Sequence, residues 1–195
     1  MVHIGIAMMV CAVSACGPRP APESTGPSSF SALLAPHIDG LWGGQATLIE
    51  VSTGAGSARN VSDATCITNR FRTAVGETLD HTLAITQTET DLQTTLAYPR
   101  TGLSCGYAGR LGTSSATLTT DTCRTPTINV LCDGAQYDLQ LVGSTLTLQL
   151  DAPVRVTSMT GTVTYAYNVF LLTEDGTNRT GTLVSSHRLT GVTRR

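Results

Sequence analysis

Short runs in which apolar residues alternate with threonine or other polar residues recur along most of this chain. A period of two places apolar side chains on one face of a strand and polar ones on the other. The clearest runs are 41–51, 81–88, 92–98, 105–111, 116–122, 137–142, 144–150, 161–172 and 181–191. Turn-forming segments at 88–91, 112–115, 143–144 and 174–178 separate neighbouring runs. The pattern predicts an all-β fold, an antiparallel up-and-down β-barrel of about eight strands whose closure removes exposed edges.

The alternation also predicts which side chains face the interior of this barrel. Residues of one parity in each run are apolar, while threonine fills much of the opposite face. The expected interior residues are Trp42, Ala46, Leu48, Leu83, Ile85, Leu146, Leu148, Leu150, Val163, Tyr165, Tyr167 and Val169. A membrane-spanning barrel would carry its apolar face outside, between girdles of aromatic residues that these threonine-rich strands lack. A barrel in water is therefore favoured.

One segment after the first strand breaks the alternation and predicts a short helix. In residues 62–75, Ser62 is a suitable N-cap and Gly76 a suitable C-terminal stop. Cys66, Phe71 and neighbouring apolar residues are spaced along one side of such a helix. We expect this helix to lie against the barrel.

Four cysteines lie in the predicted barrel region, and an even number in an exported domain indicates two disulfides. They allow three pairings. A hairpin centred near Ser114 would place Cys105 opposite Cys123, which leaves Cys66 to pair with Cys132. A metal site is disfavoured, because no Cys-x-x-Cys pair is present and His81 and His187 lack ligand spacing.

The chain begins with an apolar segment, residues 1–15, that is too short to span a bilayer and is typical of a signal peptide. Residues 13–16, Val-Ser-Ala-Cys, resemble the lipobox of bacterial lipoproteins. That resemblance implies a lipid-anchored protein of the bacterial cell envelope, with Cys16 as the lipidated N-terminus. Gly17, rather than aspartate, favours the outer membrane or cell surface. The leader lacks the usual Lys or Arg, so ordinary secretion with cleavage elsewhere is the alternative.

Three regions follow from these features. Residues 1–15 form the signal peptide, and residues 16–38 form the lipidated cysteine with a flexible tether rich in Pro and Ser. Residues 39–195 form a single β-barrel domain of a length that folds alone, and we expect a monomer.

The start of the first strand, Gly40-Leu41-Trp42, resembles the Gly-x-Trp of the calycin superfamily, the lipocalin-like and avidin-like barrels. In those families the tryptophan plugs the closed end of the barrel, and an arginine near the last strand packs across its ring. The resemblance implies that Trp42 closes this barrel and that Arg188 forms a cation-π contact with it.

Charge and composition disfavour several function classes. The formal net charge is −2 and 13% of residues are charged, which argues against binding to nucleic acid. The chain has no lysine, so a Schiff base or a P-loop lysine is excluded. The carboxylates are scattered, and each histidine of the domain stands alone in a strand. We therefore expect neither an enzyme nor a cofactor or metal site.

Two functional hypotheses remain. In the first, the barrel mouth binds a small apolar ligand, with Tyr98, Tyr107, Tyr165 and Tyr167 as aromatic walls. In the second, side chains fill the barrel, and its surface binds an envelope protein, a glycan or an enzyme, as an inhibitor would. Aliphatic residues alternate with small ones in these strands, which is compatible with both hypotheses.

Overall fold

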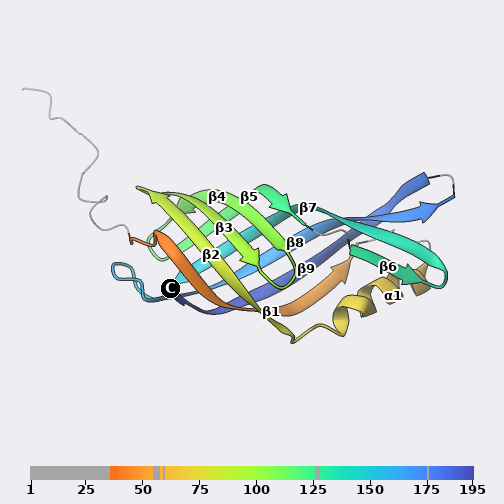
Figure 1. Cartoon of the computed structure of the whole chain (residues 1–195), viewed down its shortest axis with the longest axis horizontal. Coiled ribbons are helices and arrows are strands. Elements are labelled where there is room, and N and C mark those ends of the chain that lie inside the picture. The colour runs from red at the N-terminus through yellow and green to blue at the C-terminus, as the bar shows by residue number, and fades with distance from the viewer. Residues whose placement is uncertain (1–35, 55–57, 59, 126–127, 175) are drawn as a thin grey trace, which may run out of the picture.

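Nine antiparallel strands and one helix form the fold in a computed structural model, which describes residues 36–54, 58, 60–125, 128–174 and 176–195 (Figure 1). The elements are β1 (Gly40–Thr53), α1 (Val61–Arg72), β2 (Thr78–Thr88), β3 (Asp91–Tyr98), β4 (Leu103–Leu111), β5 (Ser115–Arg124), β6 (Ile128–Cys132), β7 (Ala135–Leu150), β8 (Ser158–Thr173) and β9 (Gly176–Arg194). The predicted signal peptide, Cys16 and most of the tether lie outside the described residues.

Eight of these strands close into an antiparallel barrel, which confirms the predicted fold class. Strands β1 to β5 pair in sequence, β1 also pairs with β9, and β9, β8 and β7 follow as neighbours. Pairing of β5 with β7 closes the barrel. The predicted helix after the first strand is present as α1, and β6 is an extra strand on the outer part of β7.

The barrel interior is apolar, as the alternation predicts. Trp42, Leu83, Leu146 and Val163 are fully buried, and every other predicted interior residue is buried except Leu150, which is half-buried. A fully buried leucine contributes about 1.5–3 kcal/mol relative to an exposed one. The central and closed parts of the barrel are thus held together by aliphatic packing.

Trp42 plugs one end of the barrel, and the residue that covers it is Arg194, not Arg188. The Trp42 indole donates a hydrogen bond of 2.8 Å to the Ile38 carbonyl, and the Arg194 guanidinium carbon lies 5.1 Å from its ring centroid. Arg188 pairs with Thr47 and is exposed on the outer face. A bulge in β9 near Gly191 explains the difference, because it transfers the inward face from odd to even residues before the strand ends.

Strand β7 corrects a second expectation. The Gly143-Ser144 pair was expected to be a turn between two strands, yet β7 runs through it without a break. A register shift between Leu141 and Gly143 marks a bulge there, so the buried face moves from Tyr137 and Leu139 to Ser144 and Leu146. The long strand can therefore pair with β5 over one half and with β6 over the other.

The outer parts of β7, β8 and β9 extend beyond the barrel, and α1 lies beside this extension at the same end of the molecule (Figure 1). The N-cap of α1 is Asn60 rather than Ser62, because the Asn60 side chain accepts a hydrogen bond of 2.8 Å from the Asp63 amide. The Tyr137 hydroxyl donates a bond of 2.5 Å to the buried Asp63 carboxylate. This bond ties the helix to β7. The described part of the chain has no helix with the length and apolar character needed to cross a membrane.

Two disulfides join the pairs that the sequence favours. Cys105 and Cys123 lie directly opposite each other on β4 and β5, with their Cα atoms 4.0 Å apart. The second disulfide joins Cys66 on α1 to Cys132 on β6. One bridge therefore staples a hairpin of the barrel, and the other holds the helix against the extra strand.

Candidate functional site

A cavity of about 220 Å³ opens at the end of the barrel opposite Trp42. Its wall includes the start of β2 and β4, the end of β3, and residues of β1, β8 and β9. The segment that links α1 to β2 and the start of β6 complete the rim. A dry engineered cavity of about 150 Å³ binds benzene, and pockets for drug-sized ligands measure about 300–1,000 Å³. This cavity has the size for a compact molecule of one or two rings.

The walls of the cavity are mainly aliphatic and aromatic. Leu48, Leu79 and Leu103 contribute from three strands of the barrel, and Phe71 and Ile128 contribute from α1 and β6. Leu48 is buried, whereas the other four are half-buried because they lie nearer the rim. An apolar molecule that enters would remove this partly wetted surface from water, which is favourable.

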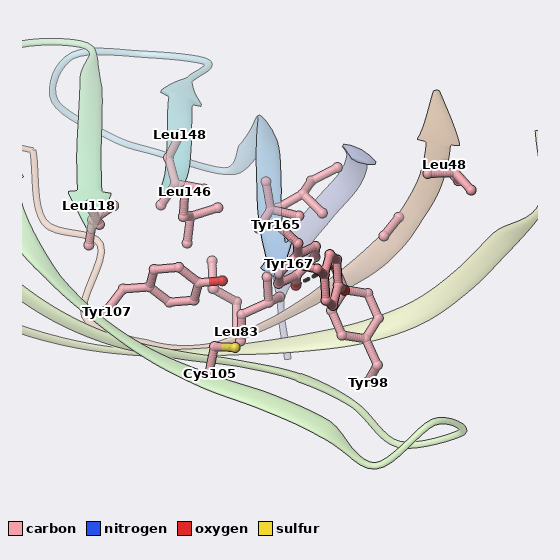
Figure 2. Close-up of a cluster of buried hydrophobic side chains, with 14 of the residues drawn as sticks. Leu48, Leu83, Tyr98, Cys105, Tyr107, Leu118, Leu146, Leu148, Tyr165 and Tyr167 are labelled. Carbon is pink, nitrogen blue, oxygen red and sulfur yellow. Dashed lines mark hydrogen bonds between the residues drawn. The ribbon is translucent and has the colours of Figure 1, made fainter. Parts of the chain in front are cut away.

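The inner surface of the cavity carries hydroxyl groups and one imidazole. It is formed by Tyr98 on β3, Tyr165 and Tyr167 on β8, and Ser185 and His187 on β9. The three tyrosines and Ser185 are buried, and His187 is half-buried. Figure 2 shows the rings of Tyr98, Tyr165 and Tyr167 gathered on one side of the buried cluster. The inner surface therefore offers several hydrogen-bonding groups without a formal charge.

Aromatic contacts hold these rings in place. The Tyr165 hydroxyl donates to the Tyr98 hydroxyl at 3.3 Å. The His187 ring meets Tyr165 edge to face with centroids 5.5 Å apart, and its centroid lies 6.5 Å from that of Tyr98. Burial raises the pKa of Tyr98 and Tyr165 above the usual value for a phenol, and it raises the pKa of Tyr167 to about 12. All three phenols are neutral at pH 7.

Tyr107, the fourth tyrosine expected at the ligand, does not line the cavity. It is buried deeper, and its hydroxyl shares a hydrogen bond of 2.8 Å with the Ser144 hydroxyl on β7. In Figure 2 its ring lies on the other side of the cluster from Tyr98, near Leu118 and Leu146. Tyr107 is thus a core residue with a satisfied hydroxyl.

Two histidines lie in the barrel interior. Burial lowers the pKa of His187 to about 4, and burial with a smaller effect of Arg195, partly offset by Asp80, lowers the pKa of His81 to about 4. His81 is fully buried, its ring centroid lies 6.2 Å from that of Tyr98, and neither ring nitrogen has a hydrogen-bond partner among the described residues. Both imidazoles are therefore neutral at pH 7.

The site combines residues that the sequence singled out with residues that it did not. Tyr98, Tyr165 and Tyr167 were expected at a ligand, whereas Ser185 and His187 were not. The alternation in β9 could have indicated them, because Ser185 and His187 are odd-numbered like Leu183 and Leu189 and so lie on the same inward face. The rim residues of α1 and β6 gave no such signal, since they reach the cavity only through tertiary packing.

No cluster of three or more potential metal ligands occurs among the residues that the structure describes. Ser185 and His187 both face the cavity, and no hydrogen bond between them is present. The arrangement can bind an apolar body and hydrogen-bond to a polar group on it. Comparisons of the chain with protein-family models, with curated proteins and with solved structures find no match.

Proposed function

We propose that this chain is a lipid-anchored protein of a bacterial envelope whose barrel binds a small, mainly apolar ligand at its open end. The observation that supports ligand binding is the cavity of about 220 Å³, with aliphatic walls and an inner surface of tyrosine hydroxyls and one imidazole. Concave sites that combine apolar walls with a few polar groups are the usual form of small-molecule sites. The proposal is binding without chemical turnover.

The distribution of packing within the barrel supports this location for the ligand. Large side chains such as Leu83, Leu96 and Leu118 are fully buried and fill the interior towards the Trp42 end. Residues at the open end are only half-buried although they are apolar, as for Leu79 and Leu103. A ligand bound among these side chains would bury the apolar surface that remains partly exposed at this end of the barrel.

The test is native mass spectrometry of the full chain, exported in a bacterial host and extracted in mild detergent. Ala74 lines the rim, so Ala74→Trp should block the cavity, whereas Ala108→Trp is a matched control on the exposed face of β4. We expect a retained small molecule on the wild-type protein and on the control, and none on Ala74→Trp. Equal retention by all three proteins would place the molecule elsewhere. Empty protein throughout, with no small apolar compound able to bind, would favour an interaction module with a filled barrel.

The anchor has its own support and its own test. It depends on the Val-Ser-Ala-Cys sequence at residues 13–16, which lies outside the described residues. We expect mass spectrometry of the N-terminal peptide to find Cys16 as the first residue, carrying a diacylglycerol group. A Cys16→Ser variant should lose the lipid and leave the membrane fraction. Cleavage at another position, with an unmodified Cys16, would indicate ordinary secretion.

A further inference from the structure

The imidazole of His187 lies in the cavity wall without a hydrogen-bond partner among the described residues. A neutral imidazole has one nitrogen that donates and one that accepts. Its ring is fixed by the edge-to-face contact with Tyr165, so its orientation does not depend on a polar partner from the protein. A ligand in the cavity can therefore supply the missing bond.

Tyr98 lines the same cavity, and its hydroxyl can still donate one hydrogen bond. It accepts a hydrogen bond from Tyr165, and its own proton has no acceptor among the described residues. The centroids of the Tyr98 and His187 rings are 6.5 Å apart, so both rings are within reach of one small polar group. A hydroxyl group fits this pair, since it can donate to the imidazole and accept from the phenol.

The charge of the cavity decides what else the ligand can carry. Glu77, which is exposed at the rim, is the charged side chain among the described lining residues, and no arginine is among them. His187 is neutral at pH 7 because burial lowers its pKa to about 4. A carboxylate or phosphate would lose its hydration without gaining a positive partner, which is unfavourable. The described residues that line the inner part of the cavity also include no carboxylate to pair with a cation.

We propose that the cavity selects uncharged ligands that have a compact apolar ring and a hydroxyl group bonded to His187 and Tyr98. This inference rests on the proposed function, because it names the ligand class for the same site. Its consequence is an order of affinities that is opposite to that of a purely apolar cavity. A dry apolar cavity favours a hydrocarbon over its hydroxylated form, because the hydroxyl loses its bonds to water.

The experiment compares four probes on one skeleton, toluene, p-cresol, 4-methylbenzoate and 4-methylbenzylamine, titrated into the full chain at pH 7 and followed by calorimetry or NMR. We expect p-cresol to bind about fivefold or more tightly than toluene, as one or two net hydrogen bonds allow. Both charged probes should bind more weakly than p-cresol. His187→Phe should reverse the order of p-cresol and toluene. His37→Phe makes the same change at an exposed histidine and should leave the order unchanged.

A second measurement does not depend on whether the His187→Phe variant folds. In the wild-type protein, the ¹⁵N shift of the accepting His187 nitrogen should move on addition of p-cresol and not on addition of toluene. Toluene that binds more tightly than p-cresol, or a charged probe that binds most tightly, would overturn the hydroxyl selection while leaving a ligand site in place. Failure of every probe to bind would instead count against the proposed function itself.

Discussion

Removal of the Cys66–Cys132 disulfide should destabilise the protein more than removal of the Cys105–Cys123 disulfide. The perturbation is a pair of alanine substitutions at each bridge, which leaves no free thiol. The sequence separation is 66 residues for the first bridge and 18 for the second. A longer closed loop removes more conformational freedom from the unfolded chain. The chain-entropy relation gives a loss of about 4 kcal/mol for the first bridge and about 3 kcal/mol for the second.

The two variants are well matched in other respects. Each variant replaces one cysteine that is almost fully buried, Cys132 or Cys105, and one that is half-buried, Cys66 or Cys123. The loop closed by Cys105–Cys123 lies within the loop closed by Cys66–Cys132. While the inner disulfide is intact, it shortens the outer loop by less than a third. The difference between the two losses therefore measures mainly the effect of loop length.

Urea unfolding followed by the fluorescence of Trp42, the single tryptophan of the chain, tests this prediction. With a denaturant slope of about 2 kcal/mol/M, the midpoints should fall by about 2 M and about 1.5 M. Coincident transitions by fluorescence and circular dichroism would show that unfolding stays two-state in both variants. Equal losses of free energy, or a larger loss for the Cys105–Cys123 variant, would refute the reasoning from loop length.

Three further outcomes are expected. Arg194→Ala should lower the free energy of unfolding by about 1 kcal/mol, because its guanidinium covers the indole that plugs the barrel. Arg188→Ala is the control and should change the free energy of unfolding by less than about 0.5 kcal/mol, since Arg188 is exposed. Equal losses in urea titrations would contradict the assignment of Arg194. Tyr107→Phe should cost about 1–2 kcal/mol through the lost bond to Ser144 and leave ligand affinity unchanged, and a weaker affinity in calorimetry would show that Tyr107 contributes to the site. Because burial lowers the pKa of His81 from 6.5 to about 4, the unfolded state takes up its proton first as pH falls. The contribution of His81 to stability is complete above pH 6.5 and should fall by about 3 kcal/mol down to pH 4, in addition to the contribution of His187. A His81→Phe variant should therefore lose less stability in acid than the wild-type protein, and the same acid sensitivity in both would argue against this.

The alternating runs predict the barrel because each strand has one face in the core and one in water. Each residue of a strand faces either the core or water, so the alternation can be recognised in the sequence without knowing which strands pair. It also predicts the inward tyrosines Tyr98, Tyr165 and Tyr167. A hairpin pairs residues at about equal distances from its turn, which places Cys105 close to Cys123, and a bulge beside Gly106 and Tyr107 brings the two cysteines directly opposite each other.

Features that depend on pairing between distant strands could not be predicted in this way. Gly143-Ser144 has the composition of a turn, yet β7 continues through it with a bulge between Leu141 and Gly143, because β8 pairs alongside. The inward residues change from odd numbers at Leu139 to even numbers at Leu146, which indicates either a turn or a bulge between them. The sequence does not distinguish the turn from the bulge. The choice of Arg194 over Arg188 depends in the same way on the bulge near Gly191.

The cavity is a further case of this kind. Parity shows that a side chain faces inward, and it gives no measure of whether neighbours fill the space beside it. That space is set by how α1 and β6 meet the barrel, which involves the Cys66–Cys132 bridge and the bond between Asp63 and Tyr137. The site could be anticipated as a set of aromatic residues, and its boundaries required the tertiary structure.

The pairing of the first strand with the last determines which end of the barrel a membrane anchor would hold. Ile38 and Arg194 both contact Trp42 at the plugged end, and the cavity lies towards the other end. The end of β8 and the start of β9 also lie away from the C-terminus, at the far side of the molecule (Figure 1). On the proposal that Cys16 carries the lipid, the tether joins the plugged end and spans up to roughly 60 Å at about 3 Å per residue. The mouth then lies at the end away from the attachment point, so the tether would leave it open to a ligand from the aqueous phase.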